Sequence, residues 1–186
     1  MMDALVFLFC WFLSRPSIAE TPTYLLAGDS FAVGLEHEFK ALGKQQGFHA
    51  VGVGKVGSRV DQWVRWLPVE LRRHRPKVVF LSLGSNDAVP EVDRLRKDPE
   101  SITQIVLATE RAGAKLVWVG PPTLPMKEIP HQDEVRTLIM ARVPLYYDST
   151  KLKIERGRDK IHSTPKGYKA WMGSLWDWTL GAGGTP

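Results

Sequence analysis

Short apolar runs alternate with segments of helical periodicity along most of this chain. Five runs are rich in β-branched or aromatic side chains, as buried strands are: Tyr24–Ala27, Phe48–Val53, Val78–Leu83, Leu116–Val119 and Leu145–Tyr147. Apolar positions recur with helical spacing in other segments: Val33–Gln45, a broken stretch over Val60–Arg73, Pro99–Ala112, Asp133–Ala141 and Thr164–Thr179. Because helices that alternate with strands connect them in parallel, the pattern predicts a three-layer α/β/α sandwich around a central five-stranded parallel sheet.

The beginning of the chain departs from this alternation. Ala4–Leu13 form an almost unbroken apolar run that is too short to span a bilayer comfortably, and small residues stand shortly before Glu20. We expect an export signal peptide over residues 1–19, and therefore a periplasmic or secreted protein. The leading Met1-Met2-Asp3 has no basic side chain, which such signals usually carry, so a membrane anchor is the alternative and a buried helix the third possibility.

The rest of the 186 residues is predicted to form one domain, because the chain has no repeat and no internal linker. We assign residues 20–180 to this domain and expect the Gly-rich residues 181–186 to form a flexible tail. A hydrophobic fraction of 44% with 24% charged residues excludes a disordered chain and a multispan membrane protein. Cys10, the single cysteine, lies in the expected leader, which excludes disulfides, thiol nucleophiles and zinc–thiolate sites in the processed chain.

The net charge of +5 would suit a polyanionic partner such as an anionic envelope surface. The basic residues are dispersed, however, and the densest groups, Arg72–Arg75 and Lys151–Lys160, are interrupted or short. Such groups are usually solvated helix ends and loops. We therefore expect at most an association with the envelope and no nucleic-acid partner; no signal indicates an oligomeric state.

Ser30 is the first candidate for chemistry. Gly28-Asp29-Ser30 directly follows the first predicted strand and precedes a helix. In an open parallel sheet, ligands bind beyond the carboxyl ends of the strands, and a helix N-terminus offers free N–H donors there. Ser30 is thus placed to act as a nucleophile, although a serine before a helix is by itself more often an N-cap.

Asp159 and His162 supply the groups that a serine nucleophile needs. They are three residues apart, so in a tight loop the carboxylate can accept a hydrogen bond from the ring's Nδ1. The other ring nitrogen is then free to take a proton from Ser30. Catalytic triads are defined by geometry and not by chain order, although surface ion pairing is the usual meaning of a lone Asp-x-x-His.

Two further strand ends carry candidate oxyanion donors. Asn86 follows the strand Val78–Leu83, where its amide can donate to a developing oxyanion, although Asn-Asp pairs also favour ordinary turns. Gly57 follows the second strand, and without a side chain its N–H can approach a substrate carbonyl. With the N–H of Ser30, these groups would form an oxyanion hole.

Together these blocks resemble the SGNH hydrolase superfamily, also called GDSL hydrolases, which is named for its Ser, Gly, Asn and His. The blocks in this chain are Gly28-Asp29-Ser30, Gly57, Gly84-x-Asn86-Asp87 and Asp159-x-x-His162. Thr164-x-x-Gly167-Tyr168 also looks like the family's last block, Gly120-Pro121-Pro122 is similar to a loop often seen there, and the resemblance spans Tyr24 to Trp178. It implies the flavodoxin-like SGNH fold and a serine esterase without a cofactor.

The chain departs from the family pattern at two points. Phe31 stands where the family's short motif has Leu, and the second block is loose enough for Gly54 to compete with Gly57 for the oxyanion role. We prefer Gly57 because a Ser-Arg pair follows it where the chain turns toward its next helix.

Three residues beside the blocks are candidate substrate contacts: Asp29, Arg59 and Trp63. Trp63, with Trp66 three residues later, could form a sugar-stacking wall, but helical spacing favours packing in the core.

Nucleotide and metal sites are less well supported. Gly52-x-Gly54-x-x-Gly57 matches the dinucleotide pattern, but it is not in the first strand–helix turn and no acidic residue closes the next strand. The remaining histidines, His37, His49, His74 and His131, share no ligand spacing. We therefore expect neither a metal nor a cofactor.

The sequence thus predicts an enzyme that hydrolyses carboxylic esters through an acyl-enzyme. Export, a basic chain and the absence of a long apolar lid favour O-acetyl groups on an envelope glycan or other carbohydrate as the substrate. Lysophospholipid or thioester hydrolysis by the same fold is the alternative. A non-catalytic surface-binding module and a polyanion-binding protein are the remaining possibilities.

Overall fold

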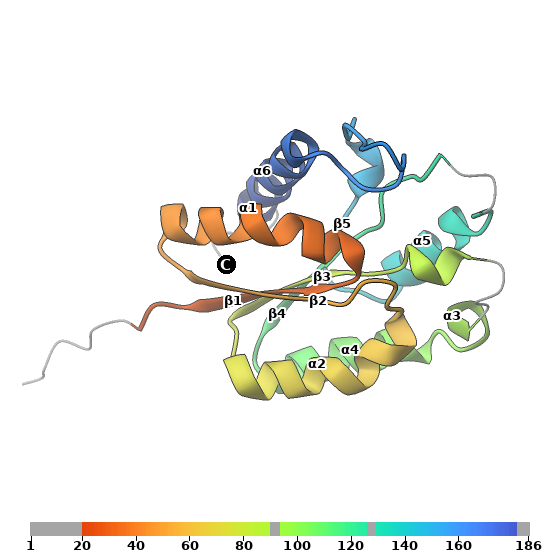
Figure 1. Cartoon of the computed structure of the whole chain (residues 1–186). Helices are drawn as coiled ribbons and strands as arrows, with labels where there is room; N and C mark the ends of the chain where they lie inside the picture. Colours follow the sequence, from red (N-terminus) through yellow and green to blue (C-terminus); the bar gives the residue numbers. More distant parts are fainter. Residues whose placement is uncertain (1–19, 90–93, 126–128, 182–186) are drawn as a thin grey trace, which may run out of the picture.

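A parallel sheet forms the middle layer of the protein (Figure 1). The computed structural model describes residues 20–89, 94–125 and 129–181. The sheet has five strands in the order β2-β1-β3-β4-β5, and all paired neighbours are parallel. Their bounds are Thr23–Gly28 for β1, His49–Gly54 for β2, Val78–Ser82 for β3, Lys115–Val119 for β4 and Tyr146–Tyr147 for β5. The predicted five-stranded parallel sheet is confirmed.

Helices cover both faces of this sheet. Figure 1 shows α1 (Ser30–Gln46) and α6 (Pro165–Gly181) on one face, and α2 (Val60–His74) and α4 (Glu100–Arg111) on the other. The helix α5 (Gln132–Met140) and the short helix α3 (Arg94–Lys97) lie beyond the carboxyl ends of the strands. Two single-turn 3₁₀ helices, η1 (Asn86–Ala88) and η2 (Ser149–Lys151), complete the elements. The three-layer α/β/α sandwich is therefore confirmed.

The sheet separates two hydrophobic cores, because successive strand residues point to opposite faces. In β1, Leu25 and Ala27 pack under α2 and α4, whereas Tyr24 and Leu26 pack under α1 and α6. Strands that are buried on both faces read as continuous apolar runs, not as an alternation of apolar and polar residues. This is why the strands were recognisable in the sequence.

Helix α2 corrects the expectation of a broken stretch. It runs without interruption from Val60 to His74, with Pro68 inside it. A proline there removes one backbone hydrogen bond. Trp63, Leu67 and Leu71 recur every fourth residue and are buried against the sheet, and this burial holds the helix together across the proline.

The ends of the chain are only partly described. Gly181, assigned to the flexible tail from its sequence, is the last residue of α6. The expected leader over residues 1–19 and the remaining tail, residues 182–186, lie outside the described residues. In the described ranges, no helix combines the length and the apolar character that crossing a membrane requires.

Candidate active site

The four sequence blocks meet beyond the carboxyl ends of the strands. The register of the sheet pairs Gly28 at the end of β1 with Gly54 of β2 and with Ser82 of β3. Ser30 begins α1 just after this point, and the loops after β2 and β3 lead to Gly57 and Asn86. In Figure 1 these strand ends lie on the side where α1 begins.

A tight turn presents Ser30 at this edge. Gly28 has φ of 142°, and a Cβ there would lie 1.9 Å from the Ser82 carbonyl oxygen, so only glycine fits. The next peptide is held by a hydrogen bond from the Asp29 N–H to the Ser82 oxygen (3.0 Å). Asp29 is the N-cap of α1, and its Oδ1 accepts from the N–H of Phe31 (2.9 Å). Ser30 is therefore the first residue of the helix, and the capping role that a lone serine suggests belongs to Asp29.

Ser30, His162 and Asp159 form a continuous hydrogen-bonded line. The Nε2 of His162 lies 2.9 Å from the Oγ of Ser30, and its Nδ1 lies 2.6 Å from Oδ2 of Asp159. The ring of His162 also packs against Phe31, with centroids 5.6 Å apart. The three residues thus have the relative positions that proton transfer from the serine to the imidazole requires, with the carboxylate orienting the ring.

The loop that carries Asp159 and His162 is held in a closed turn. The N–H of Gly157 donates to the carbonyl of His162 (2.7 Å), and that of Lys160 donates to Gly157 (3.1 Å). Lys160 takes the left-handed conformation with φ of 59°. The second carboxylate oxygen of Asp159 accepts the N–H groups of Ile161 (3.0 Å) and His162 (2.9 Å). The carboxylate is therefore aimed at the ring by the backbone of its own turn.

These hydrogen bonds also determine the charge of Asp159. The bond to the His162 ring, followed by the two backbone N–H bonds, lowers the pKa of Asp159 to about 2. The carboxylate is thus ionised at any ordinary pH, and it favours the imidazole tautomer that keeps a proton on Nδ1.

Two backbone donors near Ser30 are unoccupied. Among the described residues, neither the N–H of Ser30 nor that of Gly57 has a hydrogen-bond acceptor. Gly57 is exposed, has φ of 72°, and has no atom within 4 Å of the position a Cβ would take. A free N–H in an open position can donate to an oxygen of a bound molecule.

Ser58 ties the Gly57 loop to both neighbouring blocks. Its hydroxyl donates to the carbonyl of Gly28 (3.4 Å), and the N–H of Lys55 donates to the same carbonyl (2.8 Å). The Asn86 amide donates to the carbonyl of Ser58 (2.9 Å). Because a carboxamide has two N–H groups, Asn86 retains a second donor for another acceptor.

Gly54 occupies a different environment. It is the last residue of β2, and a Cβ there would lie 2.3 Å from Cγ2 of Val33. Its lack of a side chain is thus explained by the close approach of α1. This geometry favours Gly57 over Gly54 as the donor toward a ligand.

The candidate substrate contacts Asp29 and Trp63 are not available to a ligand, and both expectations require correction. Asp29 is fully buried as the cap of α1. Trp63 is 0% exposed within the core, where its Nε1 donates to the hydroxyl of Ser58 (2.9 Å). Through this hydrogen bond to Ser58, the buried indole holds the loop that contains Gly57. Arg59 is half-buried at the N-cap of α2, and its Nε lies 3.6 Å from Asp61.

Asp87 has a role that sequence reasoning did not assign. Both of its carboxylate oxygens lie 3.3 Å from the N–H of Val60, so it caps α2 and joins the β3 loop to the end of the Gly57 loop. Burial raises the pKa of Asp87 to about 7, and it does the same for Asp29. The signal available in the sequence was the carboxylate beside Asn86 in the Gly84-x-Asn86-Asp87 block.

The described residues offer no metal site, because no group of three or more His, Cys, Asp or Glu side chains could hold an ion.

Comparison with protein-family models and with curated proteins finds no match. Solved structures do resemble the chain. A lipolytic protein of the G-D-S-L family from Desulfitobacterium hafniense DCB-2 has a TM-score of 0.70 at 19% identity, over 86% of this chain and 100% of that one. A lipase/acylhydrolase from Enterococcus faecalis has a TM-score of 0.65 at 18% identity, over 86% and 95%.

An acetyl xylan esterase from Geobacillus stearothermophilus, crystallised as its W215I variant, has a TM-score of 0.64 at 14% identity, over 84% of this chain and 93% of that one. At such identities the likeness concerns the fold. The chain therefore has the α/β fold of the GDSL/SGNH esterases and lipases, as its motifs predicted.

Proposed function

We propose that this protein is a serine esterase that hydrolyses carboxylic esters through an acyl-enzyme on Ser30. The observation that carries the proposal is the line from the Ser30 hydroxyl through the His162 ring to the Asp159 carboxylate, with contacts of 2.9 and 2.6 Å. A hydroxyl bonded to an oriented imidazole is the arrangement that activates a weak nucleophile.

In the first half of the reaction, Ser30 Oγ attacks the ester carbonyl carbon while His162 Nε2 takes the hydroxyl proton. The ionised Asp159 stabilises the imidazolium that forms. The tetrahedral oxyanion would be bound by the free N–H groups of Ser30 and Gly57 and by the second amide N–H of Asn86. His162 then gives its proton to the leaving alkoxide, and the alcohol departs.

In the second half, a water molecule takes the place of the alcohol. His162 removes a proton from this water as its oxygen attacks the acyl carbon, and the same oxyanion donors stabilise the new intermediate. Collapse of the intermediate breaks the bond to Ser30 Oγ, which recovers its proton from the imidazolium. The products are the carboxylic acid and the free enzyme, and no cofactor enters the balance.

We assign the substrate as an O-acetyl group on a carbohydrate, such as a glycan of a cell envelope. The side chains of His162 and Asp159 keep 39% and 49% of their area exposed, so a bulky alcohol can approach the site. A long acyl chain would instead need an apolar channel to bury it. The structural likeness to an acetyl xylan esterase also supports acetyl transfer from a sugar. Lysophospholipids and thioesters are the alternative substrates.

The test is hydrolysis of p-nitrophenyl esters and of an acetylated glycan by the protein and by Ser30→Ala. We expect turnover of the acetyl ester that Ser30→Ala abolishes, and a rate that falls as the acyl chain lengthens. Equal turnover by Ser30→Ala would reject the mechanism. Preference for the octanoyl over the acetyl ester would retain the mechanism but reject the assigned substrate.

A fluorophosphonate probe separates an esterase from a binding module that has kept the fold without turnover. We expect covalent labelling of the protein at Ser30 and none of Ser30→Ala. A folded protein that neither labels nor hydrolyses the acetyl ester would be a non-catalytic module.

A further inference from the structure

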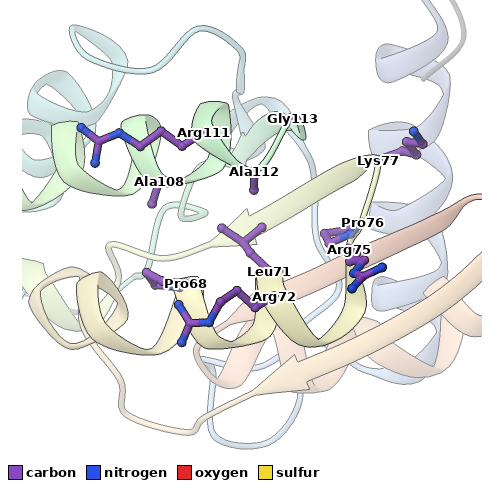
Figure 2. Close-up of a pocket in the computed structure, with 10 residues that line it drawn as sticks. All are labelled: Pro68, Leu71, Arg72, Arg75, Pro76, Lys77, Ala108, Arg111, Ala112 and Gly113. Atoms are coloured by element: carbon purple, nitrogen blue, oxygen red, sulfur yellow. The ribbon is translucent and has the colours of Figure 1, made fainter.

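A pocket of about 750 Å³ (Figure 2) lies where β3 and β4 begin, which is the opposite end of the strands from Ser30. It is formed where α2 and α4 end and β3 and β4 begin. The lining residues are Pro68, Leu71, Arg72, Arg75, Pro76, Lys77, Ala108, Arg111, Ala112 and Gly113. Apolar side chains from both helices form the floor of this basic pocket.

The basic pocket carries an unbalanced positive charge. Its lining includes Arg72, Arg75, Lys77 and Arg111 but no acidic residue. Within the part of the chain that the structure describes, none of these four side chains forms an ion pair or a hydrogen bond. Figure 2 shows Arg72 and Arg111 projecting from the two facing helices. Four cations around one hollow are suited to bind an anion.

The neighbouring acidic residue of α2 does not neutralise this charge. Glu70 lies 3.4 Å from Arg73 and 3.3 Å from His74, and so pairs with residues outside the lining. Favourable interaction with the helix C-termini accounts for basic residues in the last turns of α2 and α4, but not for Lys77, which precedes β3. Arg75 also holds a left-handed conformation, with φ of 45°, at a position where glycine is normally favoured.

The basic pocket lies at the end of the sheet that is remote from the candidate active site. The N–H of Lys77 donates to the carbonyl of Thr23 (2.8 Å), so the pocket lies at the edge where β1 begins. A surface that docks at this end of the sheet would therefore leave Ser30 facing away from it.

We propose that the basic pocket binds the phosphate groups of anionic phospholipids at a membrane surface. Anionic lipid headgroups attract clustered Lys and Arg side chains, and guanidinium groups bind phosphate with paired hydrogen bonds. The protein would dock by this edge and present Ser30 and His162 to the space beyond the membrane. This inference does not depend on the esterase activity.

The experiment measures sedimentation of the full chain with vesicles of phosphatidylcholine, with and without phosphatidylglycerol. The readout is the ratio of the two affinities, because any contribution from the apolar run is shared by both vesicles. Each basic residue near an anionic surface contributes about a fivefold change in affinity. We therefore expect the double variant Arg72→Gln/Arg111→Gln to lower this ratio by roughly thirtyfold.

The matched control is Lys166→Gln/Lys169→Gln, which removes the same charge from the exposed start of α6, outside the lining of the basic pocket. We expect this control variant to have the same ratio of affinities for anionic and neutral vesicles as the wild type. Added salt should lower that ratio for the wild type and for the control variant. Circular dichroism and thermal melting check that each variant is folded.

Three outcomes would overturn the inference. The first is equal binding to neutral and anionic vesicles by the wild type. The second is an equal loss in the two double variants, which would indicate net charge and not the pocket. The third is pocket-dependent binding to a soluble polyanion such as DNA without binding to anionic vesicles.

Discussion

Replacing Asp87 with Asn should remove a large part of the pH dependence of folding stability. Asp87 is almost fully buried, and its carboxylate accepts the N–H of Val60, whose nitrogen lies 3.3 Å from each oxygen. Burial, with a further contribution from the charge of Asp61, raises the pKa of Asp87 from its usual 3.8 to about 7, against the opposing effects of the Val60 N–H and Arg59. An asparagine keeps an oxygen for Val60 but cannot ionise.

Whether Asp87 raises or lowers stability with pH depends on which state, folded or unfolded, binds its proton more tightly. Because the pKa of Asp87 is higher in the folded state, the folded protein keeps its proton at a pH where the unfolded chain has lost it. The stability contributed by Asp87 is thus fully present below about pH 4 and is lost as the pH rises to about 7. A rise in pKa from 3.8 to about 7 corresponds to a loss of about 4 kcal/mol.

The assay is urea unfolding of the wild type and Asp87→Asn at about pH 4 and about pH 8. We expect similar free energies of unfolding at the lower pH, and a more stable Asn variant at the higher pH. Asp177→Asn, at an exposed position of α6, is the matched control. The charge of Asp87 also raises the pKa of Asp29, so part of the remaining pH dependence should weaken too. A difference between wild type and Asp87→Asn that is the same at both pH values would refute this reasoning.

Three further predictions concern the proposed reaction. Asn86→Ala should lower kcat by about a hundredfold to a thousandfold in a p-nitrophenyl acetate assay, because an oxyanion donor is lost, and a decrease of less than about threefold would rule out that role. Asp159→Asn should lower kcat by up to about ten-thousandfold, because the amide cannot stabilise the imidazolium. Because the pKa of Asp159 is about 2, this carboxylate should stay ionised while wild-type activity falls toward acid pH. The fall should therefore follow the uptake of a single proton. A slope of about two in a plot of the logarithm of the rate against pH would contradict this assignment.

The periodicity of the sequence was sufficient to predict the sheet and the main helices. The buried strands read as apolar runs, and β1 to β4 each begin and end within one residue of the predicted positions. The short helix α3 was not predicted, because four residues are too few to show a helical period.

The candidate site was predictable for a related reason. A parallel sheet brings all strand ends of one kind to a single edge, so the sequence alone groups Ser30, Gly57 and Asn86 at one place. The pairing of Asp159 with His162 was equally local, because their separation by three residues permits a closed turn.

Burial was the property that the local pattern did not decide. Trp63 could be a sugar contact or a core residue at the same helical spacing, and its position beneath Ser58 settles the question. The role of Asp87 depends on the N-terminus of α2, which is distant in the chain but adjacent in space.

The sequence by itself determined which chemical groups this protein has, the order of its strands and helices along the chain, and the sheet edge where the groups gather. Only the tertiary structure decided the separation of 2.9 Å between Ser30 and His162, which are 132 residues apart, and the grouping of Arg72 and Arg111 around one pocket. The physical reason is that periodicity and turn chemistry act between near neighbours, whereas these distances result from how whole helices pack against the sheet.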